Sequence, residues 1–93
     1  MKRIFVIGNI KSKDEIQKVQ EELESKGNIV FGMYSFEPMS SLMYEARVES
    51  LKNAEIVYVV KEEGIHLDSL TASIVSKAKE FEKIILYNGK FIF

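Results

Sequence analysis

The 93-residue sequence contains no cysteine, which excludes a disulfide framework, a thiolate metal site and a cysteine nucleophile. Its only histidine is His66, and a single histidine without clustered partners argues against a metal site. The longest apolar runs, such as Ile56–Val60, have the length of a strand and are far too short to span a bilayer. Basic and acidic residues number 13 and 14, so there is no basic excess for bulk nucleic-acid binding. We therefore expect a cytoplasmic protein without metal, cofactor, nucleic-acid or membrane partners.

The residues that are present predict one globular domain over 1–93. Hydrophobic residues make up 46% of the chain and charged residues 29%, an ordinary balance for a globular domain of this size. Short apolar runs alternate with longer amphipathic segments, and the runs are continuous, as in strands covered on both faces. The expected strands are Ile4–Ile7, Ile29–Phe31, Ile56–Val60 and Ile84–Tyr87. The expected helices are 13–26, 40–53 and a third that begins near Ser69.

Local signals support the helices. Ser12 and Glu15 have the spacing of a capping box at the start of the first helix, and Gly27 is a helix stop. In the second helix, Leu42 or Met43, then Ala46 or the stem of Arg47, then Leu51 are the expected buried positions. The third helix has a clear apolar seam with Asp68 or Ser69 as its cap. That seam consists of Leu70, Ile74, Ala78 and Phe81.

The end of the chain adds one more expected strand. Asn88-Gly89 is a strong signal for a two-residue hairpin, and Phe91–Phe93 is predicted to pair back as an antiparallel edge strand. Strands that alternate with helices imply right-handed crossovers. The sequence therefore predicts a three-layer, doubly wound α/β fold of the Rossmann or flavodoxin type. Its mostly parallel sheet has the order 2-1-3-4, with the C-terminal strand beside strand four.

Ligands of such sheets bind beyond the carboxyl ends of the strands, so the loops at those ends hold the candidate site residues. Gly8 and Asn9 follow the first strand, in a loop that matches neither a dinucleotide fingerprint nor a P-loop. Asp68, Ser69 and Thr71 open the third helix, where hydroxyls, amides and a carboxylate suit a ribose or a phosphate. The same three residues equally suit an ordinary helix cap followed by solvated first-turn side chains.

The order of these motifs resembles the nucleoside 2-deoxyribosyltransferase-like family over nearly the whole length. The first strand ends at Gly8, although Asn9 stands where that family has proline. Gly27–Phe31 matches the second strand, and Asn53–Val60 matches a helix end that leads into a strongly apolar strand. A glycine loop, a Ser/Thr-rich helix start and the segment Ala78–Ile85 complete the pattern.

The resemblance implies cleavage of a nucleoside or nucleotide N-glycosidic bond by a glutamate in the first turn of the third helix. That glutamate falls on Ile74, or on Ser73 with a shift of one residue, and neither is acidic. Asp68 is the nearest carboxylate and the one candidate for catalysis. We therefore favour a catalytically silent protein that binds a nucleoside or nucleotide through Gly8, Asn9, Asp68, Ser69 and Thr71. The alternatives are an N-glycosidase or deoxyribosyltransferase that uses Asp68 or a neighbouring subunit's carboxylate, and a protein-interaction module without catalysis.

We also expect a homodimer. Small domains gain stability from burial between subunits, and one stretch of this chain concentrates apolar and aromatic side chains. These are Met33, Tyr34, Phe36, Met39, Met43 and Tyr44. The family that the sequence resembles also commonly assembles into oligomers.

Overall fold

The computed structural model describes residues 1–32 and 41–88. Strands and helices alternate along the chain, as the sequence predicts. The strands are β1 (Arg3–Gly8), β2 (Ile29–Gly32), β3 (Ile56–Val60) and β4 (Ile84–Tyr87). The helices are α1 (Lys13–Ser25), α2 (Ser41–Asn53) and α3 (Ser69–Glu80), with a short 3₁₀ turn, η1 (Ile10–Ser12), before α1. None of the helices in these ranges is long and apolar enough to cross a membrane.

The four strands form one parallel sheet in the order β2-β1-β3-β4, which confirms the predicted order. The central strand β1 pairs with β2 on one side and with β3 on the other, for example through Val6, which lies opposite both Gly32 and Tyr58. The strand order reverses direction between β1 and β3, so their carboxyl ends mark the switch point of the sheet. The predicted antiparallel strand Phe91–Phe93 lies outside the described residues, and the strands within them are all parallel.

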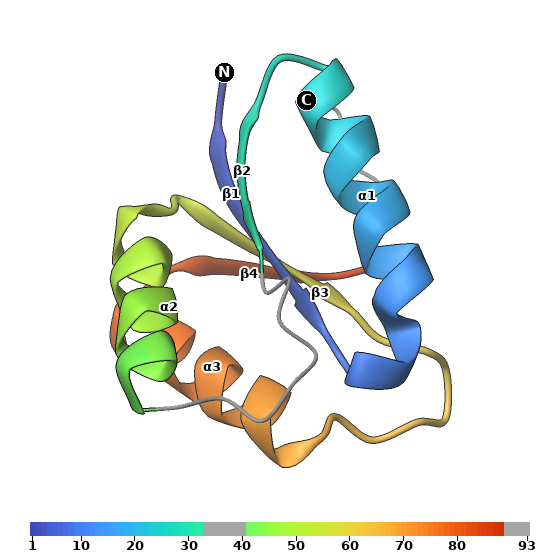
Figure 1. Ribbon diagram of the computed structural model, residues 1–93, viewed down its shortest axis with the longest axis vertical. Helices are drawn as coiled ribbons and strands as arrows, with labels where there is room; N and C mark the ends of the chain where they lie inside the picture. The colour runs from blue at the N-terminus through green and yellow to red at the C-terminus, as the bar shows by residue number, and fades with distance from the viewer. Residues whose placement is uncertain (33–40, 89–93) are drawn as a thin grey trace.

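Three layers follow from the alternation of side chains along the strands (Figure 1). Helix α1 covers one face of the sheet, while α2 and α3 lie together on the other. On the α1 face, a buried cluster joins Ile4, Val6, Ile16, Leu23, Ile56 and Val60. On the opposite face, the larger cluster contains Phe5, Ile7, Leu51, Ala54, Val57, Val59, Ile74, Val75 and Ala78.

The start of α1 differs from the prediction. Ser12 makes no side-chain cap, and its hydroxyl instead donates to Glu62 Oε1 at 3.4 Å. An N-cap residue needs an extended backbone. The 3₁₀ turn, closed by Ser12 N–H donating to the Asn9 carbonyl at 2.8 Å, gives Ser12 φ −96° and ψ 21° instead. The predicted capping box of Ser12 and Glu15 is therefore wrong, whereas Gly27 follows the helix with φ +88°, as a helix-ending glycine should.

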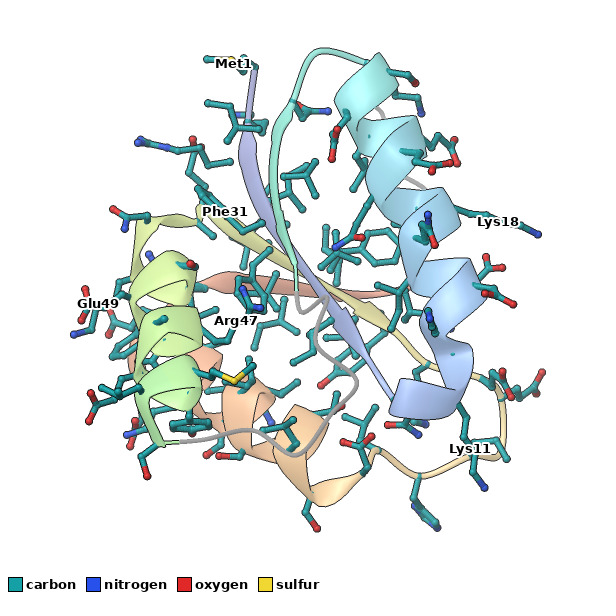
Figure 2. The ribbon with its side chains drawn as sticks, in the orientation of Figure 1. Met1, Lys11, Lys18, Phe31, Arg47 and Glu49 are labelled. Atoms are coloured by element: carbon teal, nitrogen blue, oxygen red, sulfur yellow. The ribbon has the colours of Figure 1, made fainter. Side chains whose placement is uncertain are left out.

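Helix α2 resolves the alternatives left open by its weak stripe. Leu51 is fully buried, whereas Leu42 is 78% exposed and Ala46 is exposed. Arg47 is half-buried and projects towards the sheet, while Glu49 points away from it (Figure 2). The Nε atom of Arg47 is buried and has no hydrogen-bond partner among the described residues. The helix is apolar on more than one side, which explains why its sequence pattern is indistinct.

Candidate functional site

The carboxyl end of β1 and the loop after β3 are joined by one side chain, Asn9. Its Oδ1 accepts from the backbone N–H of Asp68 at 2.8 Å, and its Nδ2 donates to the carbonyl of His66 at 2.8 Å. These partners are 59 and 57 residues away in the sequence. A carboxamide that both donates and accepts satisfies two backbone groups at once. Asn9 therefore helps to hold the loop of residues 61–68 against the switch point of the sheet.

The start of α3 is fixed by a second set of hydrogen bonds. Asp68 is its N-cap, and Asp68 Oδ1 accepts from the backbone N–H of Thr71 at 2.8 Å. The Thr71 hydroxyl donates to the carbonyl of Gly8 at 3.0 Å, and Thr71 is only 2% exposed. Of the two predicted caps, Asp68 is the one in the structure. Its backbone is extended, and its carboxylate accepts from the N–H of Thr71, the third residue of α3.

The structure thus brings together all five sequence-predicted site residues at the carboxyl edge of the sheet. Gly8, Asn9, Asp68 and Thr71 make hydrogen bonds to one another or to the adjoining backbone. Ser69 is the exposed member of the set. The first four residues build and orient this edge, and Ser69 presents its hydroxyl to solvent from the first turn of α3.

Replacing Asn9 by alanine is expected to lower the free energy of unfolding by about 1–2 kcal/mol, since a partly buried backbone N–H and an exposed backbone carbonyl lose their partner. Asn9→Asp keeps the acceptor and loses the donor, so its effect is expected to lie between alanine and wild type. The matched control is Asn53→Ala, which removes one exposed hydrogen bond to the Glu49 carbonyl. Urea unfolding followed by circular dichroism measures all three, and equal stabilities of Asn9→Ala and Asn53→Ala would contradict the connecting role.

The position that the family resemblance assigns to the glutamate lies in the core. Ile74 is 0% exposed and belongs to the buried cluster between the sheet and α3. The neighbouring alternative, Ser73, is half-buried, and its hydroxyl lies 2.7 Å from the hydroxyl of Tyr44 on α2. Neither residue is a carboxylate, and Ile74 fills the space beneath the strands with an apolar side chain.

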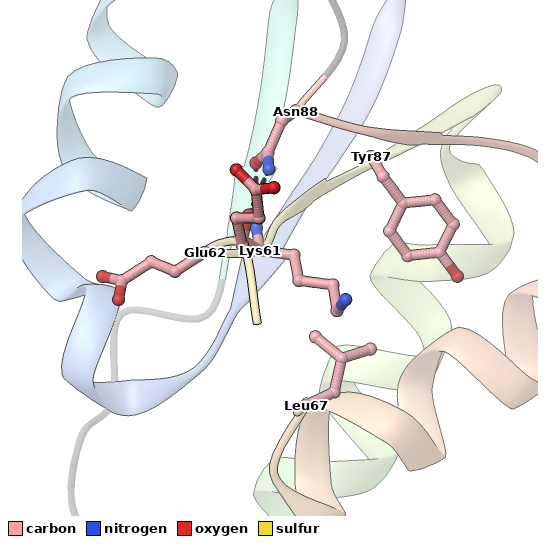
Figure 3. A pocket seen from close by; sticks show the side chains of 6 residues that line it. Lys61, Glu62, Leu67, Tyr87 and Asn88 are labelled. Carbon is pink, nitrogen blue, oxygen red and sulfur yellow. Dashed lines mark hydrogen bonds between the residues drawn. The ribbon is translucent and has the colours of Figure 1, made fainter. Parts of the chain in front are cut away.

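A cleft of about 590 Å³ lies beyond the carboxyl ends of β3 and β4 (Figure 3). Its volume is within the ordinary range for small-molecule sites. The lining residues are Lys61, Glu62, Glu63, Leu67, Tyr87 and Asn88. The Lys61 ammonium extends into the space between the Tyr87 ring and the Leu67 side chain, while Glu62 points the other way. Leu67 directly precedes Asp68, so the cleft adjoins the predicted site residues on the other side of the same loop.

The lining of this cleft comes from the loop after β3 and from the end of β4, which no single sequence motif joins. In the sequence, Asn88 gives only a hairpin signal, and Lys61, Leu67 and Tyr87 belong to no motif. The available signal was positional, since Lys61 follows β3 and Asn88 follows β4, and both carboxyl ends meet at this edge. Asn88 does adopt the left-handed backbone expected for a turn, with φ 46°.

Two further features lie outside this edge. Within residues 1–32 and 41–88, no group of three or more histidine, cysteine, aspartate or glutamate side chains is placed to hold a metal ion. Tyr58 on β3 packs against the α1 face of the sheet. Burial raises the pKa of its hydroxyl, and the nearby carboxylates Glu15 and Glu22 raise it further. Tyr58, whose pKa is raised, therefore lies on the face of the sheet that α1 covers, and α3 lies on the other face.

Comparison with known proteins gives a likeness of fold. No protein-family model matches the sequence, and no curated protein matches it either. Among solved structures, a 2-desoxiribosyltransferase from Leishmania mexicana superimposes with a TM-score of 0.72 at 12% identity, over 94% of this chain and 63% of that one. A CMP N-glycosidase from Clostridium botulinum superimposes with a TM-score of 0.63 at 18% identity, over 92% of this chain and 70% of that one.

The two structural neighbours agree with the resemblance seen in the sequence and confirm the fold that it implies. The chain spans less than two thirds of the length of the first neighbour. At these identities the likeness establishes the arrangement of strands and helices, and not the chemistry performed at its edge.

Proposed function

We propose that this protein binds a nucleoside- or nucleotide-type ligand at the carboxyl edge of its sheet and does not cleave the ligand's glycosidic bond. The absence of cleavage is inferred from Ile74, which is completely buried at the position where the family resemblance places the attacking glutamate. Displacement at an anomeric carbon needs a nucleophile held at a fixed distance from it, and an aliphatic side chain has no lone pair to supply.

The proposal of ligand binding rests on the residues at the carboxyl edge of the sheet. Gly8, Asn9, Asp68 and Thr71 hold the start of α3 in place, and Ser69 offers a hydroxyl at the positive end of the helix dipole. Hydroxyls and first-turn amides suit the oxygens of a sugar or a phosphate. Fold likeness to a desoxiribosyltransferase and to a CMP N-glycosidase supports this ligand class.

Asp68 is a weak candidate for catalysis because its carboxylate already accepts from the Thr71 amide. A carboxylate that caps a helix is stabilised in that position, and the hydrogen bond that it accepts makes it a weaker nucleophile. We therefore assign Asp68 a positioning role at the start of α3.

The binding prediction is tested by thermal shift and calorimetry across nucleosides and nucleoside monophosphates, since a ligand that binds only the folded state raises its melting temperature. Ser69→Glu is expected to weaken binding of a monophosphate by about tenfold through charge repulsion. An acidic residue in the first turn favours the helix dipole, so the unliganded variant should melt no lower than wild type. Ser76→Glu, at an exposed position later in α3, is the control. Unchanged affinity of Ser69→Glu would remove Ser69 from the site.

Chemistry is tested by incubating the same ligands with wild type and Asp68→Asn and following free base by chromatography. No release by either protein is expected. Release by wild type that disappears in Asp68→Asn would establish an enzyme that uses Asp68. Release that survives the substitution would point to another carboxylate, including one from a neighbouring subunit. Absence of both binding and release would favour an interaction module.

We also propose that the protein works as a homodimer in the cytoplasm. The absence of cysteine fits a reducing compartment. The start of α2, where Leu42 is 78% exposed and Met43 is half-buried, supports an interface on that side. Light scattering at high micromolar concentration tests the assembly, and a monomeric mass would contradict it.

A further inference from the structure

The cleft beyond β3 and β4 is lined by two apolar side chains and one cation, together with the carboxylates of Glu62 and Glu63 and the amide of Asn88. Tyr87 is 48% exposed and turns its ring into the cleft, opposite the side chain of Leu67 (Figure 3). Burying the face of an aromatic ring against a planar ligand is favourable, and stacking of a base on an aromatic side chain is worth about 1–3 kcal/mol. The ring and the leucine therefore suit a flat molecule that slides between them.

Lys61 supplies the charge. The ion pairs found within residues 1–32 and 41–88 do not include it, whereas lysines elsewhere, such as Lys52 and Lys77, pair with neighbouring glutamates. Its ammonium extends between Tyr87 and Leu67. Glu62, the adjacent carboxylate, points away and accepts from Ser12, while Glu63 also lines the cleft. A cation that lies between two apolar side chains and is not paired with a carboxylate favours a ligand with an anionic group.

The backbone of Lys61 is held by an unusual partner, the side chain of Asn88. Asn88 Oδ1 accepts from the Lys61 N–H at 2.8 Å, and Asn88 Nδ2 donates to the Lys61 carbonyl. The backbone N–H of Asn88 donates to the Val59 carbonyl at 2.9 Å. The carboxamide thus continues the pairing of β3 with β4 by one step beyond the last strand residue. The backbone of Lys61 is fixed before any ligand arrives, which lowers the backbone entropy lost on binding.

We infer that this cleft holds the aromatic part of an anionic ligand, with its ring between Tyr87 and Leu67 and its anionic group on the Lys61 ammonium. Taken with the proposed function, on which this step rests, the ligand is a nucleotide rather than an uncharged nucleoside. The aromatic ring and the lysine of this cleft both lie at the carboxyl ends of β3 and β4, and the cleft residue Leu67 directly precedes Asp68, the N-cap of α3.

The inference is tested by calorimetry with matched pairs, each a nucleoside and its monophosphate, and with phenyl phosphate as the simplest ring-plus-phosphate probe. Lys61→Gln is expected to weaken the monophosphate by about tenfold and to leave the nucleoside within about twofold, because only the phosphate meets the ammonium. Tyr87→Ala is expected to weaken both by about tenfold, and Tyr87→Phe to keep both, because stacking needs the ring and not the hydroxyl.

Two controls separate this site from general effects. Lys79→Gln makes the same change of charge at an exposed position near the end of α3 and should leave every affinity unchanged. Asn88→Gly tolerates the left-handed backbone but removes the carboxamide, so it should weaken the monophosphate while Lys61 itself is intact. Melting temperatures of the unliganded variants show that each one is folded.

The outcomes distinguish this inference from the proposed function. If nucleotides bind wild type, Lys61→Gln and Tyr87→Ala with equal affinity, the inferred role of the cleft is overturned and the proposed nucleotide binding stands. Phenyl phosphate binding that depends on Lys61 and Tyr87, without any nucleotide binding, would support the cleft and overturn the proposed ligand class. Failure of all probes to bind wild type would overturn both.

Discussion

Ile74→Glu, which restores the residue type that the family resemblance requires, is expected to abolish folding and not to create an enzyme. Ile74 is fully buried among Phe5, Ile7 and Val57, where a carboxylate would have neither water nor a cation. Placing an unpaired charge in a core costs at least about 4 kcal/mol, which is most of the stability of a small domain. Circular dichroism and urea unfolding measure the loss.

Two companion variants make the Ile74 result interpretable. Ile74→Ala removes the same packing without the charge and is expected to cost about 2–5 kcal/mol. Ser73→Glu introduces the same carboxylate one residue earlier, at a half-buried position beside Tyr44, and is expected to remain folded. A folded, cooperative Ile74→Glu protein would show that this position reaches the edge of the sheet, and any base release by it would overturn the assignment of a silent site.

Gly8→Ala is expected to be the most damaging single-methyl change in the candidate site. A Cβ at Gly8 would stand 2.7 Å from the backbone carbonyl oxygen of Val60 and 3.1 Å from the Val60 Cβ. Because β1 and β3 are hydrogen-bonded at that point, neither strand moves aside without disturbing the sheet. Overpacking of this kind costs about 3 kcal/mol, and chemical denaturation measures it.

Gly64→Ala is the matched control for Gly8→Ala. Gly64 has φ +78° and open space around its Cα, so alanine there meets backbone strain of about 1 kcal/mol and no clash. At Gly8 the cost of alanine comes instead from the close contact of its Cβ with β3. A stable Gly8→Ala protein with weakened ligand binding would instead place Gly8 against the ligand, as the sequence alone suggested.

Much of the fold follows from the sequence because its signals are local. Continuous apolar runs such as Ile56–Val60 need cover on both faces, and the seam through Ile74 and Ala78 fixes which side of α3 faces the sheet. The Asp68 cap and the stop at Gly27 also depend only on neighbouring residues. Parallel order then follows from the alternation of strands and helices.

The remainder depends on contacts between distant residues. The sequence placed Asn9 near a ligand, but its two hydrogen bonds are to residues more than fifty positions away, which spacing cannot reveal. Serine is a common helix cap, yet the backbone of Ser12 lies in a 3₁₀ turn and its hydroxyl donates to Glu62. The cleft required Lys61 and Tyr87 to meet across neighbouring strands, and Asn88 showed only its turn preference in the sequence.

The loop of residues 61–68 is held near its two ends by side-chain amides, Asn88 directly after β4 and Asn9 directly after β1. Each amide binds two backbone groups, so this wall of the cleft behaves as part of the sheet and not as a lid. The consequence is kinetic. Association at the cleft should be a single exponential whose rate rises linearly with ligand concentration, because no opening of this loop precedes entry. In Asn9→Ala, loosening one side of the wall should add a slower phase whose rate no longer depends on concentration.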